Sequence, residues 1–347
     1  MKLKSMLLGT AASLVMTSGA FAADAMGETV VPVAVDYVKV CDAAGAGFFT
    51  IPGGETCLKI GGRIRAWAFY DEDADDDDAG FRVDARVDFE TYSMSDLGEV
   101  RSFLRLESGG NDTYGRRGSL QARDDLVAIT QAYIQVGYLT VGYTADGDFL
   151  YDDDAMMGIN DVGFGPLAAG VFAQVRADDL GGGMFAGIQA VVGDGEDRLL
   201  RPTSEDAYAI QGIVGIADQA WGDANLSAAW GDSNDGADVQ AFTVKATGNF
   251  TITEQLSARA TVGYLDFDGD DAVGVGGGLS FAATDAITVY TSGLYLFVDG
   301  DDAFGANAGL SYGIGTGLTL DAEVAYFDDG GDDDGDLWVG TRLVREW

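Results

Sequence analysis

The sequence has 347 residues, with 57 acidic and 20 basic side chains, no histidine and a formal net charge of -37. A nucleic-acid partner requires a concentrated basic face, so we expect none. Absence of histidine excludes histidine-dependent nucleophiles and histidine-ligated zinc or haem, and two cysteines are too few for a four-thiolate metal site. Hydrophobic residues make up 47% of the chain, more than a disordered acidic tail contains.

The first 22 residues have the features of an export signal. Lys2 and Lys4 precede a short apolar stretch, residues 6–15, and Ala20-Phe21-Ala22 fits the small-x-small cleavage rule. We therefore predict a signal peptide over residues 1–22. A transmembrane anchor is the alternative, but spanning requires ~20 apolar residues, and polar residues interrupt this stretch. No later segment resembles a membrane helix, so the exported chain is either soluble or a closed outer-membrane β-barrel.

The next segment, residues 23–57, is predicted to be a periplasmic extension that contains both cysteines. Cys41 and Cys57 follow the export signal, and in an oxidising periplasm a disulfide is their expected state. In the chain-entropy model such a bond contributes ~3 kcal/mol. A redox motif is the alternative, but the spacing is far wider than C-x-x-C.

Residues 58–347 alternate apolar with polar or small residues. In residues 319–326, for example, Leu320, Val324 and Tyr326 share one face and Asp321 lies on the other. A side-chain period of two indicates β-strands. Sixteen such segments predict an all-β fold, a 16-stranded antiparallel transmembrane β-barrel. The expected strands start near residues 58, 80, 99, 126, 139, 169, 183, 206, 222, 238, 255, 272, 286, 303, 317 and 335.

The connections between these segments are of two kinds that alternate along the chain: one kind is rich in acidic residues, and the other is short. Outer-membrane barrels have long external loops and short periplasmic turns, so the acidic connections are predicted to be external. They hold more than half of the acidic residues and cover residues 71–79, 109–124, 145–168, 193–206, 231–238, 266–271, 299–302 and 328–336.

The aspartate runs in these connections have two interpretations. A solvated rim is favoured over specific calcium sites, although residues 266–271 and 332–336 offer the oxygen ligands that calcium prefers. Neither run has the glycine and glutamate positions of an EF-hand loop. We expect no cofactor, with divalent cations bound by the loops as the alternative.

Arginines concentrate in the first three predicted strands. Alternation places them on one face of each strand, opposite apolar residues, and an arginine facing lipid at the midplane costs ~2–4 kcal/mol. They are therefore predicted to form a basic wall at the pore constriction. Pairing with carboxylates on neighbouring strands, a stabilising role only, is the alternative, and both can hold together. The predicted wall consists of Arg63, Arg65, Arg82, Arg86, Arg101 and Arg105.

The third external connection, about residues 145–168, is the longest. A 16-stranded barrel is wide enough to hold water, so a long loop folded inward could narrow it. Acidic residues of this loop opposite the arginines would create a transverse field that favours polar, hydrated solutes. The predicted acidic side of the constriction consists of Asp146, Asp148, Asp152, Asp153, Asp154 and Asp161.

Residues 37–63 resemble the start of the mature alphaproteobacterial porins of the Rhizobium/Brucella type. The similarity includes the paired cysteines, the run Phe49-Thr-Ile-Pro-Gly53 and the segment Glu55-Thr-Cys-Leu58 that leads into the first strand. The resemblance implies a 16-stranded trimeric general-diffusion porin with an inward third loop. Two features depart from the family: the external connections are more acidic, and the chain ends in Trp347, with Arg345 two residues before it.

The sequence therefore predicts a passive outer-membrane channel of a Gram-negative bacterium for small hydrophilic solutes and ions. We expect contacts with membrane lipid and lipopolysaccharide, and weak cation preference because an acidic vestibule concentrates cations. A substrate-specific channel, for a sugar or another small solute, is the main alternative. An exported acidic calcium-binding adhesin would require nonapeptide-like repeats, and we find none. A barrel enzyme is disfavoured because histidine is absent.

Overall fold

The computed structural model describes most of the chain from residue 38 onward. The described residues are 38–72, 77–108, 127–145, 150, 155–160, 170–193, 207–234, 238–298, 302–330 and 335–347. The predicted signal peptide lies outside them, so that hypothesis stays a prediction. No helix among these residues is long and apolar enough to cross a membrane.

Within the described residues, sixteen long antiparallel strands form one continuous sheet. Their bounds are β3 (Cys57–Glu72), β4 (Asp77–Ser95), β5 (Gly98–Ser108), β6 (Ala128–Val136), β7 (Leu139–Thr144), β8 (Gly170–Ala177), β9 (Met184–Gly193), β10 (Ala207–Gln219), β11 (Gly222–Asn234), β12 (Asp238–Thr251), β13 (Leu256–Phe267), β14 (Asp270–Ala282), β15 (Ile287–Val298), β16 (Ala303–Gly315), β17 (Leu318–Asp328) and β18 (Asp336–Glu346).

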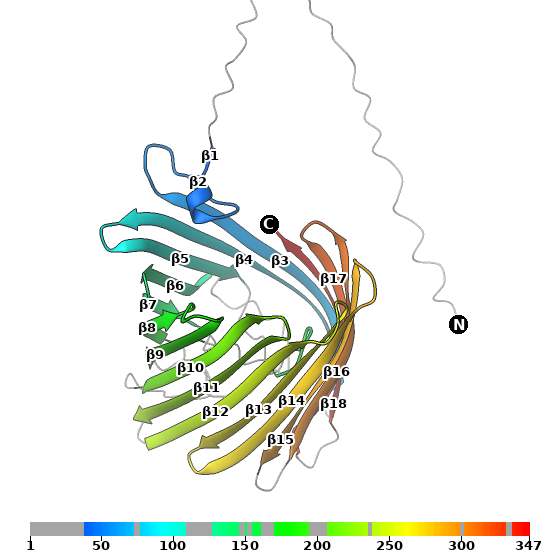
Figure 1. Ribbon diagram of the computed structural model, residues 1–347. Coiled ribbons are helices and arrows are strands. Elements are labelled where there is room, and N and C mark those ends of the chain that lie inside the picture. The colour runs from blue at the N-terminus through cyan, green and yellow to red at the C-terminus, as the bar shows by residue number, and fades with distance from the viewer. Residues whose placement is uncertain are drawn as a thin grey trace, which may run out of the picture. The chain divides into compact units, whose positions relative to one another are not determined.

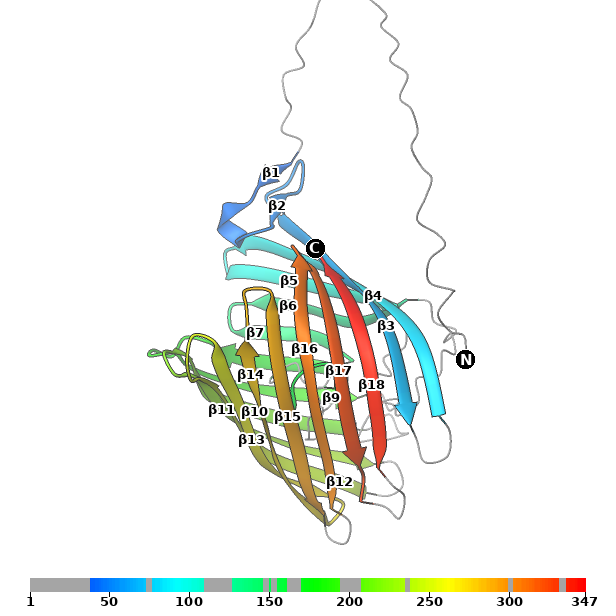
Figure 2. The ribbon, with the colours of Figure 1, turned by 90° about the vertical axis from the view of Figure 1, so that its right-hand side faces the viewer.

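The sheet closes on itself. Each strand pairs with the next along the chain, and the last strand, β18, pairs with β3, from Leu337 opposite Glu72 to Glu346 opposite Arg63 (Figures 1 and 2). Closure leaves none of these sixteen strands with an unpaired edge, as a membrane-spanning sheet requires. The predicted 16-stranded β-barrel is confirmed, and each predicted strand start lies within three residues of the observed one.

Several strands are longer than the membrane requires. β3 has 16 residues and β4 has 19, whereas about 9–11 suffice to cross a bilayer. The two connections predicted at residues 71–79 and 266–271 are shorter in the structure than in the prediction. Their flanking strands stay paired up to Glu72 and Phe267. The hydrogen-bonded ladder continues because pairing satisfies the backbone polar groups.

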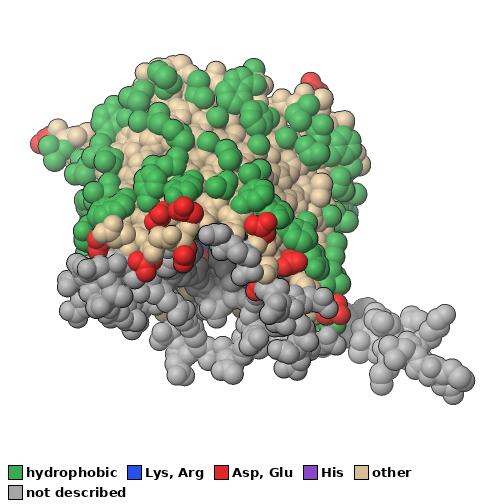
Figure 3. All heavy atoms as spheres, turned by 90° about the horizontal axis from the view of Figure 1, so that it is seen from below, with side chains coloured by type: hydrophobic (Ala, Val, Ile, Leu, Met, Phe, Trp, Pro, Cys, Tyr) green, Lys and Arg blue, Asp and Glu red, His purple; other side chains and the backbone are tan. Residues whose placement is uncertain are grey.

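The two faces of the sheet differ in polarity. Along β13, Val262 is 51% exposed, whereas its neighbour Thr261 is 3% exposed and hydrogen-bonds Thr247 on β12. Figure 3 shows hydrophobic side chains over the outer wall of the barrel and acidic side chains along the rim at the end seen there. Apolar residues thus face outward and polar residues inward, the inverse of a water-soluble β-barrel.

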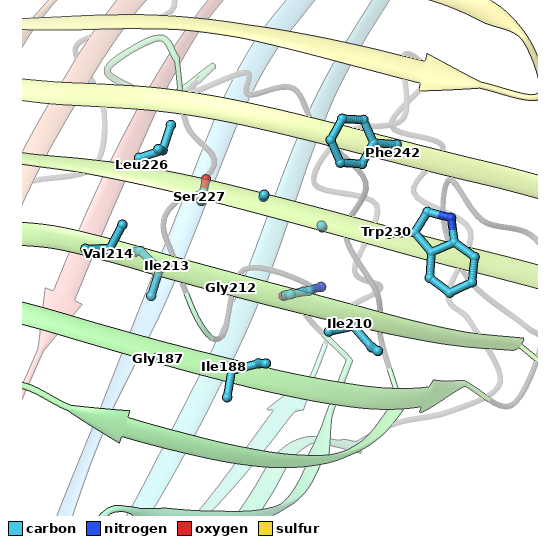
Figure 4. A pocket seen from close by; sticks show the side chains of 13 residues that line it. Gly187, Ile188, Ile210, Gly212, Ile213, Val214, Leu226, Ser227, Trp230 and Phe242 are labelled. Atoms are coloured by element: carbon cyan, nitrogen blue, oxygen red, sulfur yellow. The ribbon is translucent and has the colours of Figure 1, made fainter.

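The outer face also carries a shallow apolar groove of about 580 Å³ across β9–β12 (Figure 4). Gly212 leaves space between the outward side chains of Ile188, Ile210 and Val214. Leu226 and Phe242 line the side formed by β11 and β12. This groove belongs to the membrane-facing surface.

The segment before the barrel is a small disulfide-bonded subdomain. It contains β1 (Lys39–Val40), a 3-10 turn η1 (Asp42–Ala44) and β2 (Phe49–Thr50), which pairs with the start of β3. Cys41 and Cys57 are bonded, which confirms the predicted disulfide. Both cysteines pack with Phe48 and with Tyr92 of β4, so this disulfide-bonded subdomain is attached to the barrel wall.

Candidate functional site

The predicted arginines lie on the inner face of β3, β4 and β5. On β3, the side chains of Arg63 and Arg65 are 22% and 13% exposed, whereas Ile64 between them is 44% exposed on the outer face. On β4, Val83 next to Arg82 is 66% exposed on the outer face. The alternation that predicted a shared inner face thus corresponds to the arrangement of these strands.

Each of the six arginines lies beside at least one carboxylate. Asp84 is central, because its Oδ1 accepts from Arg65 Nε at 2.7 Å and its Oδ2 lies 3.8 Å from Arg82 Nε. The indole Nε1 of Trp67 also donates to Asp84 Oδ2, at 2.9 Å. Asp84 is 5% exposed, so two hydrogen-bond donors of β3 and one further guanidinium of β4 surround one buried carboxylate.

A second junction lies toward β5. Asp88 Oδ1 accepts from Arg105 Nε at 2.9 Å, and Asp88 Oδ2 lies 3.2 Å from Arg86 Nε.

The two remaining arginines also have acidic neighbours. Arg101 Nη1 donates to Glu90 at 3.2 Å and its Nε donates to Glu99. Arg63 Nη2 lies 3.6 Å from Glu107. We call the six arginines with these carboxylates the arginine ladder.

A further ion pair lies beside the ladder, across the seam where the barrel closes. Arg342 of β18 donates to Asp321 of β17 at 3.0 Å, and its guanidinium lies 5.1 Å from the centre of the Trp67 ring. Arg65 stacks on the same ring at 5.3 Å. Asp321 was visible in the sequence as part of a polar strand face, but its position near Trp67 depends on the pairing of β18 with β3.

The ladder contains nearly as many carboxylates as guanidiniums. The structure therefore shows the guanidiniums paired with carboxylates, the alternative that the sequence analysis gave as compatible with a basic wall. Paired charges fix one another's side-chain positions and leave little net charge to attract or repel mobile ions.

The predicted acidic side of the constriction lies outside the described residues, as Asp146, Asp148, Asp152, Asp153, Asp154 and Asp161 are not among them. What is described of the connection between β7 and β8, residues 145–169, is Ala145, Leu150 and residues 155–160. We call this connection the inner loop, because its described residues 150 and 155–160 contact the inward face of the wall.

The first contact is at Leu150, which is fully buried against Ile213 of β10 and Phe185 of β9. Its carbonyl oxygen accepts from Arg176 Nη1 of β8 at 2.7 Å.

The second contact, at residues 155–160, is with strands β15, β16 and β17, which are not neighbours of β8–β10 in the sheet. Ala155 and Met156 are fully buried with Leu294 of β15. The backbone of Met157 both donates to Ser292 Oγ of β15, at 2.8 Å, and accepts from Asn307 Nδ2 of β16, at 2.5 Å.

Glu323 of β17 completes this contact. Its carboxylate accepts from the backbone N–H groups of Ile159 and Asn160 at 2.7 and 3.0 Å. The sequence reasoning missed Ser292, Asn307 and Glu323. Alternation placed Glu323 on a polar face, but no local pattern could identify partners 164 residues away.

The inner loop thus touches the wall at β8–β10 and again at β15–β17. The arginine ladder occupies β3–β5, and the Arg342–Asp321 pair lies beside it on β17 and β18. The two contacts cannot lie far from each other in space. An extended chain spans ~3.5 Å per residue, so residues 150 and 155 lie at most ~17 Å apart. The arrangement offers a polar interior with charged groups on one side and a loop segment on another.

The described residues contain no group of three histidine, cysteine, aspartate or glutamate side chains placed to hold a metal ion. Residues 332–334 of the second predicted oxygen-rich run lie outside the described residues. Loop-bound divalent cations therefore stay a hypothesis.

Comparison with known solved structures shows the same fold. The outer-membrane channel DcaP of Acinetobacter baumannii is similar with a TM-score of 0.66 at 14% identity, covering 86% of this chain and 99% of that one. The anion-selective porin of Comamonas acidovorans is similar with a TM-score of 0.63 at 13% identity, covering 84% and 100%.

Sequence comparison identifies the family. The profile of the family described as Porin subfamily matches residues 29–339. Porin Omp2b of Brucella suis is 32% identical over 322 residues, which cover 82% of each chain. The resemblance noted in residues 37–63 is thus confirmed, and the family indicates a channel and not an enzyme. The chain belongs to the porin subfamily, and with its closed barrel it is an outer-membrane porin of the alphaproteobacterial type.

Proposed function

We propose that this porin conducts small hydrophilic solutes and ions by passive diffusion through a passage between the inner loop and the arginine ladder. The observation that carries the proposal is the attachment of residues 150 and 155–160 to the inner wall. A loop fixed there occupies part of a lumen that a 16-stranded barrel would otherwise leave open. The ladder supplies a polar, charged surface along which hydrated solutes can pass.

We further propose a weak preference for cations. The guanidiniums of the ladder are balanced by Asp84, Asp88 and the other paired carboxylates, so the wall adds little net charge. The net charge of -37 then dominates the potential at the mouth of the channel. An acidic vestibule raises the local concentration of cations, an effect that salt screens.

Planar-bilayer recordings across a potassium chloride gradient test both statements. The purified porin is expected to give stepwise conductance and a reversal potential on the cation side, larger at low salt. An Arg63→Ala/Arg65→Ala/Arg101→Ala variant is expected to change the conductance and increase cation preference. Arg345→Ala, a charge change outside the ladder at the end of β18, is the control. Absence of conductance would overturn the channel function, and identical recordings for the triple variant would overturn the role of the ladder.

We also propose the homotrimer that the family resemblance implies, with lipid and lipopolysaccharide around it and divalent cations between acidic loops and lipid phosphates. An unheated sample in detergent is expected to migrate as a trimer on a gel and as a monomer after boiling. Addition of a chelator is expected to lower the temperature of this transition. A monomeric band in every mild detergent would contradict the trimer, and an unchanged transition temperature would contradict the cation bridges.

A further inference from the structure

We propose that Glu323 is the positioning residue that holds the inner loop in the lumen. This inference rests on the proposed function, because it concerns the loop that narrows the passage. Its basis is a set of hydrogen bonds among described residues that lie far apart in the sequence.

Four donors converge on the Glu323 carboxylate. Oε2 accepts from the backbone N–H of Ile159 at 2.7 Å and from the hydroxyl of Tyr290 at 2.8 Å. Oε1 accepts from the backbone N–H and the side-chain Nδ2 of Asn160, at 3.0 and 2.6 Å. Three of the four donors therefore come from the inner loop, and Tyr290 of β15 orients the carboxylate from the wall.

The position of Glu323 makes these bonds difficult to replace. The residue is only 4% exposed, so little water is available to its donors if the carboxylate is removed. A buried N–H group left without an acceptor is destabilising, and hydrogen bonds to a charged acceptor are stronger than neutral ones. A glutamine at this position would provide a single acceptor oxygen and would direct its own N–H₂ group at the donors of the loop.

The loop backbone is adapted to this close approach. Gly158 has φ +107°, in the region that L side chains rarely adopt. A Cβ built at Gly158 would lie 2.1 Å from Glu323 Oε2 and 2.3 Å from Tyr290 Cε2. Glycine thus allows the loop backbone to lie directly over the carboxylate, and we infer that Gly158 and Glu323 act as one dock.

Asn307 and Ser292 attach the neighbouring part of the loop. Asn307 Oδ1 accepts from Ser292 Oγ at 2.5 Å, while Asn307 Nδ2 donates to the carbonyl of Met157. These neutral contacts support the dock but carry no charge. Among the three described wall side chains that hydrogen-bond residues 157–160, which are Ser292, Asn307 and Glu323, the Glu323 carboxylate is the charged one.

The experiment compares Glu323→Gln, Glu323→Asp and Gly158→Ala in the full-length porin. Glu323→Gln removes the charge and the second acceptor oxygen, whereas Gly158→Ala disturbs the same dock without changing any charge. Hydrogen exchange of the peptide that contains residues 157–160 reports the dock directly. Single-channel recordings report the passage, and the heat-modifiable band reports that each variant has folded.

Faster exchange is expected at residues 159 and 160 in Glu323→Gln and Gly158→Ala, by tenfold or more. Both variants are also expected to show severalfold more spontaneous closures and open-channel noise than the wild type. Glu323→Asp, which keeps the charge on a shorter side chain, is expected to fall between. A Met157→Cys/Ser292→Cys variant, oxidised in the Glu323→Gln background, is expected to restore quiet recordings because it reattaches the loop.

Unchanged exchange in both variants would overturn the dock. A change of reversal potential in Glu323→Gln alone, with Gly158→Ala like the wild type, would show that Glu323 acts only through its charge and would also overturn it. Faster exchange without any change in the recordings would leave the dock in place and contradict the proposed narrowing of the passage.

Discussion

At the scale of single residues, the inner wall of this porin is organised by carboxylates that each serve several donors. Asp84 accepts hydrogen bonds from Arg65 and Trp67 and lies close to Arg82. Glu323 accepts three hydrogen bonds from donors of the inner loop. A buried carboxylate surrounded in this way fixes the orientation of long side chains that would otherwise be mobile in the lumen. The arrangement at each position depends on which residues the register places opposite one another.

The Asp84 junction gives a prediction for both selectivity and stability. Asp84→Asn removes the counter-charge of Arg65 and Arg82 while keeping the shape of the side chain, so the reversal potential is expected to move toward anions. Asp84→Ala removes all three acceptor contacts and is expected to lower the free energy of unfolding by about 1–3 kcal/mol. Recordings across a salt gradient and urea titration of the heat-modifiable band measure the two effects. An unshifted reversal potential in Asp84→Asn would show that the pair does not influence the permeating ions.

At the scale of elements, each strand has two faces of opposite polarity. On β3 the side chains of Arg63 and Arg65 point inward and Ile64 points outward, and neighbouring strands repeat the pattern in register. This alternation is visible in the sequence, and it is why the strand starts were predicted within three residues. Some strands continue into residues predicted as connections, such as β11 to Asn234 and β13 to Phe267, because paired hairpins continue beyond the membrane where side-chain polarity no longer has to alternate.

The alternation predicts that a charge is tolerated on one face of β3 and not on the other. Ile64→Arg, between two natural arginines, would place a guanidinium on the outer face and is expected to lower the free energy of unfolding, by less than the ~2–4 kcal/mol of a midplane arginine because Ile64 lies opposite Arg345 near the end of β18. Ile64→Val, which changes volume without charge, is the matched control and is expected to have a small effect. Urea titration of both variants in lipid vesicles measures the difference. Equal stability of the two variants would mean that Ile64 does not face lipid.

At the scale of the whole molecule, the barrel depends on one long-range pairing, between β18 and β3. The C-terminal residue takes part in this seam, since Trp347 and Gly62 exchange backbone hydrogen bonds in both directions, at 3.2 and 3.3 Å. The Trp347 ring lies over Gly62, and the absence of a side chain there permits the contact.

Two adjacent glycines test the seam. A Cβ at Gly62 would lie 2.5 Å from the carbonyl oxygen of Arg86 and 2.7 Å from Trp347 Cζ2, whereas at Gly61 it would meet only Trp347 O, at 3.5 Å. Gly62→Ala is therefore expected to destabilise the barrel by about 1–3 kcal/mol, as overpacking does, and to lower the yield of folded protein. Gly61→Ala is expected to fold like the wild type. Equal yields on refolding into detergent would contradict a constraint at this seam.

The sequence by itself determined the strands, their number, the inward arginines and the disulfide partners. These features follow from a side-chain period of two, from the cost of charge in lipid and from the presence of only two cysteines. The tertiary structure decided which charges meet and where the inner loop attaches. Arg342 approaches Trp67 only because β18 closes onto β3, and Glu323 meets Ile159 across 164 residues of chain. Local pattern fixes the face on which a residue lies, but its partners depend on register and closure, which are properties of the complete barrel.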